Sequence, residues 1–162
     1  MTTQLPTRTL GGLDVTIVGL GCNNFGRRLD AAGTRAVVDA ALQDGINFFD
    51  TADIYGGIGA SERLLGEALR GRRDDVVLAT KFGMAMDGAP GYPDAPRGSG
   101  PYIDHALRES LRRLEVERID LYQYHQPDGV TPIEETLRAL DKHVRAGIVR
   151  EIGASNFSGA QL

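Results

Sequence analysis

The chain has one cysteine, no tryptophan and very little lysine. Cys22 has no second cysteine to pair with among the 162 residues, which is typical of a protein from a reducing compartment. Of the 18 basic residues only Lys81 and Lys142 are lysines. Basic runs are absent and the formal net charge is −4, so the composition argues against nucleic acid or an anionic membrane as the main partner.

Long apolar runs are missing as well. No stretch approaches the roughly 18 apolar residues that span a bilayer, and residues 1–4 show neither the basic nor the apolar region of a signal peptide. The spacing of His and Cys is not that of a metal site, and no phosphate-binding glycine fingerprint is present. We therefore expect a cytoplasmic protein that acts on a small molecule without a metal.

Short strand-like runs alternate with helical patterns along the chain. The apolar periodicity predicts a hairpin over residues 7–15, strands over 16–20, 46–49, 76–80, 119–124 and 148–154, and helices over 34–43, 61–70, 101–114 and 132–146. Alternation of this kind predicts a parallel sheet with right-handed crossovers. With 41% hydrophobic residues, the chain can form an ordinary core.

An open doubly wound sheet and a (β/α)8 barrel of the TIM type both satisfy this pattern. Polar residues end four successive strands instead of clustering at one switch point, which favours the barrel. A full barrel needs about 250 residues, whereas five strands and four helices are predicted here and residues 158–162 would begin a fifth helix. We expect residues 1–162 to form one domain, the N-terminal portion of an incomplete α/β barrel. Its open edges would allow self-association.

The clearest helix signals surround residues 131–147. Thr131 is the expected N-cap, Pro132 the first helical residue and Glu134 the reciprocal capping-box residue. The spacing of the apolar residues predicts an inner face made of Ile133, Leu137, Leu140 and Val144.

Residues 82–100 form an unusually long connection that is rich in glycine and proline. Loops beyond about 12–15 residues are usually functional or disordered. Two readings stay open for this segment, a substrate lid over the barrel mouth and a flexible insertion.

Four residues with chemically active side chains lie at or just past the ends of predicted strands. They are Asp50, Tyr55, Lys81 and His125. The carboxyl ends of parallel barrel strands form one mouth, so these side chains are expected to converge. A carboxylate, a phenol, an ammonium and an imidazole together can transfer protons, which indicates an enzyme. Each residue also has a purely structural reading, and Asp53 could replace Asp50 as the carboxylate.

Four segments, taken in order, resemble the aldo-keto reductases. They are residues 50–56 (DTADIYG), 79–83 (ATKFG), 120–128 (DLYQYHQPD) and 152–157 (IGASNF). The resemblance extends from about residue 8 to the end of the chain. It implies a (β/α)8 barrel that reduces an aldehyde or ketone to an alcohol, with NADP(H) favoured as cofactor and NAD(H) as the alternative.

The resemblance also implies a role for each of the four residues. Tyr55 would donate the proton to the carbonyl oxygen. Lys81 would stabilise the resulting phenolate, as an opposite charge does within about 4–6 Å, and Asp50 would pair with the buried ammonium. His125 would orient the carbonyl through a hydrogen bond.

Further positions are implied to bind the cofactor and the substrate. The cofactor contacts would be Gly21, Cys22, Asn23, Asp50, Ser155 and Asn156, and the substrate contacts would be Asn24, Phe25, Tyr55 and His125. A Ser-Asn pair also commonly forms a turn or a helix cap. The back half of the family's barrel, with its remaining cofactor contacts, has no counterpart in these residues. A non-catalytic module that senses a cofactor or binds a partner is therefore the alternative function.

Overall fold

The computed structural model describes residues 5–86 and 89–161. The expectation about a signal peptide concerns residues 1–4 and therefore lies outside the described residues. Within the described ranges, no helix combines the length and the apolar character that crossing a membrane requires. A cytoplasmic location stays a prediction.

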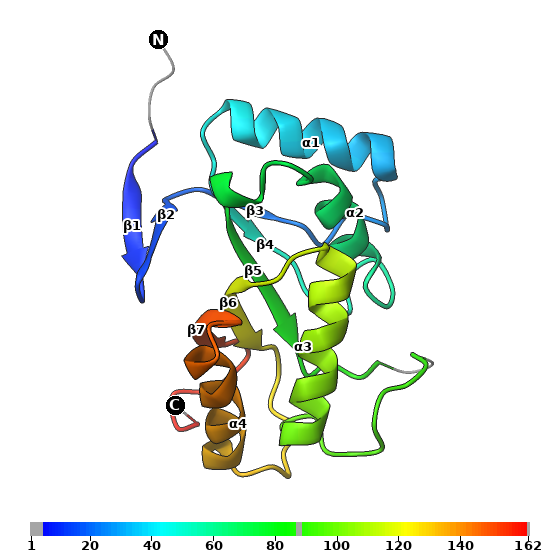
Figure 1. Ribbon diagram of the computed structural model, residues 1–162, viewed down its shortest axis with the longest axis vertical. Helices are drawn as coiled ribbons and strands as arrows, with labels where there is room; N and C mark the ends of the chain where they lie inside the picture. Colours follow the sequence, from blue (N-terminus) through cyan, green and yellow to red (C-terminus); the bar gives the residue numbers. More distant parts are fainter. Residues whose placement is uncertain (1–4, 87–88, 162) are drawn as a thin grey trace.

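An antiparallel hairpin precedes a parallel sheet (Figure 1). The hairpin consists of β1 (Thr7–Leu10) and β2 (Leu13–Thr16), and the sheet consists of β3 (Gly19–Gly21), β4 (Phe48–Asp50), β5 (Val77–Phe82), β6 (Ile119–Tyr124) and β7 (Val149–Ala154). The five parallel strands pair in chain order from β3 to β7. A doubly wound sheet would reverse its order at a switch point, so the predicted barrel type is confirmed, with five of its strands present.

In the described residues, four helices form the outer layer of this sheet (Figure 1). They are α1 (Ala31–Gln43), α2 (Ala60–Ala68), α3 (Gly100–Leu114) and α4 (Ile133–Arg145), and a short 3-10 helix, η1 (Arg73–Asp75), precedes β5. Helix α1 begins earlier than predicted because the Asp30 side chain accepts a hydrogen bond of 2.8 Å from the Gly33 backbone N–H and caps the helix. The first barrel strand begins at Gly19 because Thr16 still pairs with Thr7 in the hairpin.

The predicted capping box of α4 is wrong. Pro132 is the N-cap and makes no side-chain cap, while the Thr131 hydroxyl donates to Asp128 over 2.7 Å. The same carboxylate accepts backbone N–H bonds of 2.8–3.0 Å from Gly98, Val130 and Thr131. Partial burial raises the pKa of Asp128, but these bonds outweigh burial and lower it to about 2. Asp128 therefore ties the start of α3 to the start of α4.

The inner face of α4 also differs from the prediction. Thr136, Ala139 and Leu140 are buried, whereas Leu137 is 45% exposed. Leu137 and Ile152 line a hollow between α4 and β7, at the edge of the sheet. The helical periodicity placed Leu137 on the apolar face of α4. It could not show that this part of the face lies at the outer edge of the sheet, beside β7.

The last described residues form a turn, and a further helix beginning there stays a prediction. Gln161 Oε1 accepts hydrogen bonds of 2.9 Å from the backbone N–H and the hydroxyl of Ser158. The Gln161 backbone N–H donates to the Ser158 carbonyl, also over 2.9 Å. In a capping box the Ser158 hydroxyl would accept a hydrogen bond from the Gln161 N–H, whereas here that hydroxyl is a donor.

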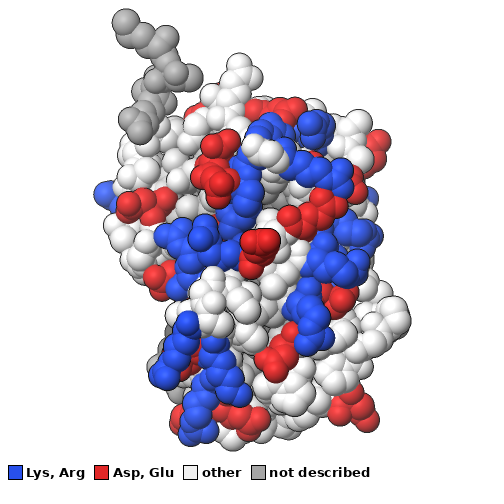
Figure 2. Space-filling view, viewed as in Figure 1, with Lys and Arg blue, Asp and Glu red and all other residues white. Residues whose placement is uncertain are grey.

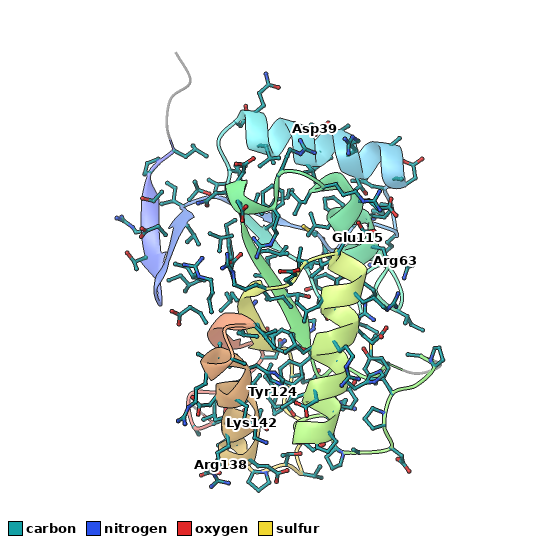
Figure 3. The ribbon with its side chains drawn as sticks, viewed as in Figure 1. Asp39, Arg63, Glu115, Tyr124, Arg138 and Lys142 are labelled. Atoms are coloured by element: carbon teal, nitrogen blue, oxygen red, sulfur yellow. The ribbon has the colours of Figure 1, made fainter. Side chains whose placement is uncertain are left out.

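Apolar side chains fill both sides of the sheet. Two clusters lie between the sheet and the helices, one under α1 and α2 and one under α3 and α4; Tyr124, in the second cluster, lies between α3 and α4 in Figure 3. Inside the curve of the sheet, Leu13 and Val15 of the hairpin pack against Val77 and Leu121. The hairpin therefore closes the interior near the amino ends of the strands and leaves the carboxyl ends open.

The long connection between β5 and α3 is anchored on the helix layer. Tyr92 packs against Tyr102 and His105 of α3, with ring centroids 5.3 and 4.5 Å apart. Figure 1 shows this segment on the side of α3 that faces away from α4. A lid function for the connection stays a prediction.

Acidic and basic side chains alternate over the face shown in Figure 2. Arg70 and Glu115 pair at 2.6 Å, and Arg112 and Glu109 pair at 2.8 Å. Exposed pairs of this kind add little stability, with a median of about 0–1 kcal/mol.

The two outer strands of the sheet present apolar side chains and unpaired backbone. Within the described residues, β3 and β7 each pair on one side only. Ile17 and Val18 beside β3 are 55% and 49% exposed, and Ile152 on β7 is 36% exposed. Because unpaired strand edges act as templates for association, we propose that the 162-residue chain by itself self-associates through them.

We expect the molar mass of the 162-residue chain to rise with protein concentration in size-exclusion chromatography with light scattering. Ile152→Lys should shift the chain toward the monomer, because a charged side chain on an edge strand opposes edge-to-edge pairing. Val130→Lys is the matched control, since Val130 is 72% exposed but lies in the loop before α4. A constant monomer mass for the unaltered chain would contradict the proposal.

Candidate active site

Alternate residues of β4, β5 and β6 face the interior and reach one rim at the carboxyl ends of the strands. Ala79 of β5 packs inside against the hairpin cluster, so Lys81, two residues later, points to the same side. The strand pairing places Lys81 opposite Gln123 and Asp50 opposite Ala79. His125 follows two residues after Gln123. The register therefore brings the predicted polar residues to the same end of the barrel interior.

Lys81 lies at the centre of this group. Its Nζ is 2.8 Å from Asp50 Oδ2, 2.8 Å from the Thr51 carbonyl oxygen and 3.5 Å from the Tyr55 hydroxyl. The Lys81 side chain is only 7% exposed. An ammonium has three N–H donors, and each of them has an oxygen partner here. This arrangement makes the buried positive charge tolerable and directs one donor at the phenol of Tyr55.

His125 lies beside Tyr55 at the same rim. The two ring centroids are 5.7 Å apart and the ring planes are 84° apart, and the His125 backbone N–H donates to the Phe82 carbonyl over 2.8 Å. Burial and then the Lys81 ammonium lower the pKa of His125 below its ordinary 6.5, against the opposing effect of Asp50. The imidazole is therefore neutral at neutral pH. Among the described residues its buried Nδ1 has no hydrogen-bond partner.

Buried hydroxyl groups hold the loop that carries Tyr55. The Ser61 hydroxyl donates to the Cys22 carbonyl over 2.7 Å and lies 2.8 Å from the Thr51 hydroxyl. These bonds join the loop after β3, the end of β4 and the start of α2. Because Thr51 and Ser61 are completely buried, the loop is tied to the sheet on its inner side.

The side chains of Cys22 and Phe25 point away from the mouth. They are 0% and 2% exposed and belong to the apolar cluster under α1 and α2, and burial raises the pKa of the Cys22 thiol. This burial does not support their predicted contacts with cofactor and substrate. They support the Tyr55 loop instead: Gly56 has a φ of 71°, and a Cβ there would lie 2.4 Å from the Phe25 carbonyl oxygen.

The remaining predicted residues of the first loop lie near the rim. Gly21 pairs with Asp50 at the end of β3, and both line a cavity of about 590 Å³ beside that strand. Asn23 is exposed and Asn24 is half-buried. The Asn24 carbonyl accepts backbone N–H bonds of 2.9–3.2 Å from residues 27–29 and so organises the turn of this loop.

Ser155 and Asn156 follow β7 and lie next to His125. The Ser155 backbone N–H donates to the Tyr124 carbonyl over 2.9 Å. Asn156 Nδ2 donates to the His125 carbonyl over 2.8 Å and to the Ser155 hydroxyl over 3.0 Å. In this structure the pair forms a turn that braces the strand end carrying His125, which agrees with the structural reading; the contact with a cofactor stays a prediction.

Two polar features of the site were missed by the sequence reasoning. Gln123 Nε2 donates to Asp50 Oδ1 over 3.2 Å. Glu62 and Arg113 form an ion pair of 2.6 Å whose side chains are 0% and 3% exposed, and Glu62 also accepts a 2.6 Å bond from the Thr80 hydroxyl. Two sequence features could have indicated these contacts. One is a glutamine within a largely apolar strand, and the other is a charged residue on the apolar face of each of two helices.

Asp53 lies behind the rim and does not replace Asp50. It is completely buried, and among the described residues neither carboxyl oxygen has a hydrogen-bond partner of normal geometry. Burial and then the Glu62 carboxylate raise the pKa of Asp53 well above its usual value, although Arg113 opposes the shift. Burial therefore favours the protonated form of Asp53, and the carboxylate that pairs with Lys81 belongs to Asp50.

Comparison with known proteins places this geometry in a family. Residues 17–162 match the Aldo/keto reductase family. The chain belongs to the aldo/keto reductases. The uncharacterized oxidoreductase YrpG of Bacillus subtilis is 42% identical over 158 residues, which cover 93% of this chain and 48% of that protein. The aldo-keto reductase yakc [NADP(+)] of Schizosaccharomyces pombe is 39% identical and covers 96% of this chain and 46% of that protein.

A solved structure agrees with the aldo/keto reductase fold. The holo form of aldo-keto reductase AKR11C1 from Bacillus halodurans superimposes with a TM-score of 0.84 at 38% identity. The match covers 95% of this chain and 51% of that chain. The chain thus spans about half the length of the relatives it matches.

The buried ion pair should be essential for stability. Arg113→Met leaves the Glu62 carboxylate buried without its partner, so we expect urea unfolding to show a loss of about 3–5 kcal/mol. Arg112→Met on the same helix is the control, because Arg112 is 65% exposed and its pair with Glu109 lies at the surface; its effect should stay within about 0.5 kcal/mol. Equal losses for both variants would refute the importance of the pair.

Asp53 should make stability fall as the pH rises. The unfolded chain releases this proton near pH 3.8, whereas the folded chain keeps it to a much higher pH, so folding becomes less favourable as the pH increases above about 4. Asp53→Asn removes the ionisation, and its stability relative to the unaltered chain should increase as the pH rises above about 4 in urea unfolding. The exposed Asp44→Asn is the control. A difference independent of pH would contradict the assignment.

Proposed function

We propose that this chain carries the proton-transfer residues of an NAD(P)H-dependent carbonyl reductase, with Tyr55 as the proton donor. The observation that carries the proposal is the Lys81 ammonium, which lies 3.5 Å from the Tyr55 hydroxyl and is fixed by Asp50 at 2.8 Å. When a phenol gives its proton to a carbonyl oxygen, it becomes a phenolate. A fixed ammonium stabilises that phenolate and makes the transfer more favourable.

His125 would hold the carbonyl group of the substrate. Its ring lies across from Tyr55 and its imidazole is neutral, so one ring nitrogen can donate a hydrogen bond to the carbonyl oxygen without adding a positive charge near Lys81. Because Nδ1 is buried, the ring nitrogen that would donate to the carbonyl is Nε2. A donor aimed at the oxygen where charge develops lowers the barrier of the reaction.

We infer that the residues at the rim would hold a nicotinamide cofactor. Gly21 and Asp50 border the open hollow along the unpaired edge of β3, and a Cβ at Gly21 would meet no atom within 4 Å, so the backbone of Gly21 is accessible to a bound ligand. Ser155 and Asn156, at the end of β7, would hold the carboxamide. The bound cofactor would supply the hydride that adds to the carbonyl carbon. The relative yakc, named for NADP(+), supports NADPH as the first cofactor to test.

Tyr55→Phe should abolish most of the activity without preventing cofactor binding. General acid catalysis contributes about 10²–10⁴-fold. The value of kcat/KM for the reduction of para-nitrobenzaldehyde by NADPH should therefore decrease by a factor of about 10²–10⁴. The decrease in reduced nicotinamide absorbance gives the rate, and quenching of nicotinamide fluorescence gives the cofactor Kd. Tyr92→Phe is the control, because Tyr92 packs on α3 outside the site.

The same assay distinguishes a reductase from the alternative, non-catalytic function. A chain that binds NADPH but never oxidises it with aldehydes or ketones would be a cofactor-sensing or interaction module. Turnover that persists unchanged in Tyr55→Phe would place the proton donor elsewhere.

A further inference from the structure

The Asp50 carboxylate is held at both of its oxygens. Oδ2 accepts from the Lys81 ammonium over 2.8 Å, and Oδ1 accepts from the side-chain amide of Gln123 over 3.2 Å. Asp50 ends β4, Lys81 lies on β5 and Gln123 lies on β6. The three side chains thus form a chain of contacts across three neighbouring strands on the interior side of the sheet.

The strand register lets Gln123 reach across the interior. Gln123 pairs with Lys81 on one side and with Gly153 of β7 on the other. A Cβ at Gly153 would lie 3.1 Å from Gln123 Cγ and 3.6 Å from its Oε1. The side chain of Gln123 therefore lies against the backbone of β7 in the space that a glycine leaves free, with its amide directed back toward Asp50.

We propose that Gln123 is a positioning residue that acts through Asp50 on Lys81 and Tyr55. A carboxylate bound only at Oδ2 could rotate about its Cβ–Cγ bond and weaken its contact with the ammonium, which would then be held mainly by the Thr51 carbonyl. With Oδ1 also bound, the carboxylate plane is set, and Lys81 keeps its remaining donor directed at the Tyr55 hydroxyl. This inference rests on the proposed reductase function.

We expect Gln123 to contribute little to the stability of the barrel. It is half-buried, uncharged and outside the three apolar clusters. Leucine has a similar size and removes only the amide. Gln123→Leu should therefore fold as the unaltered chain does, and its circular dichroism and unfolding midpoint test this directly.

The first test measures kcat and KM separately for a variant that lacks the Gln123 amide. Gln123→Leu should lower kcat for aldehyde reduction by NADPH roughly tenfold, the effect of one lost hydrogen bond to a charged group, and leave KM for both substrates within about twofold. Gln126→Leu is the matched control, since Gln126 is exposed just past the same strand. A kcat equal to that of the control, or a change confined to KM, would overturn the proposal.

Gly153 provides a second test through coupling. Gly153→Ala should lower kcat because the added Cβ displaces the Gln123 side chain. In a Gln123→Ala background the displaced group is absent, so the same glycine substitution should add little further loss. Independent, multiplicative losses would show that Gly153 acts without Gln123 and would contradict the proposed geometry.

A spectroscopic test does not depend on activity. Asp50→Ala removes the acceptor of the Gln123 amide, so the side-chain amide proton of Gln123 should move upfield in a ¹⁵N–¹H NMR spectrum while that of Gln126 stays in place. If the unaltered protein shows no turnover, the reductase proposal fails, and this spectrum still decides whether Gln123 holds Asp50. An unshifted Gln123 resonance would refute the contact.

Discussion

The buried ammonium of Lys81 is the constraint on which the site depends. A positive charge that is only 7% exposed must have oxygen partners, and Asp50, the Thr51 carbonyl and Tyr55 provide them. Each partner belongs to the end of β4 or to the loop after it. The need to provide oxygen partners for one amine therefore joins two strands and a loop, and it places a phenol beside a cation at the rim.

The interior and the helix layer of the barrel contribute to this site in different ways. Inside, the apolar hairpin cluster closes the amino ends of the strands, so the polar groups can gather only at the carboxyl ends. Behind the rim, the Glu62–Arg113 pair and the Ser61–Thr51 hydroxyl contact fix α2, α3 and the Tyr55 loop against the sheet. The polar residues at the carboxyl ends form the candidate site, and the buried contacts behind the rim hold those residues in position.

The same parallel register that assembles the site also leaves the sheet with two outer strands in the described residues. A family member of roughly twice this length superimposes on 95% of the chain with a TM-score of 0.84, so the strands β3 to β7 already have the curvature of the closed barrel. The exposed Ile152 and Leu137 lie at one outer strand, and Ile17 and Val18 lie at the other. Apolar side chains at these positions favour contact with another apolar surface over contact with water.

Local sequence patterns determined the element types, the strand-end positions of Asp50, Tyr55, Lys81 and His125, and the family, because strand and helix periodicities and short motifs are properties of adjacent residues. Tertiary structure decided what depends on residues far apart in the chain. It buried Cys22 and Phe25 in the helix layer, exposed Leu137 at an edge, chose Asp50 over Asp53 as the partner of Lys81, and brought Gln123 to Asp50 across 73 residues. The physical reason is that the burial of a side chain, and the partners that satisfy its polar atoms, are set by packing between strands and helices.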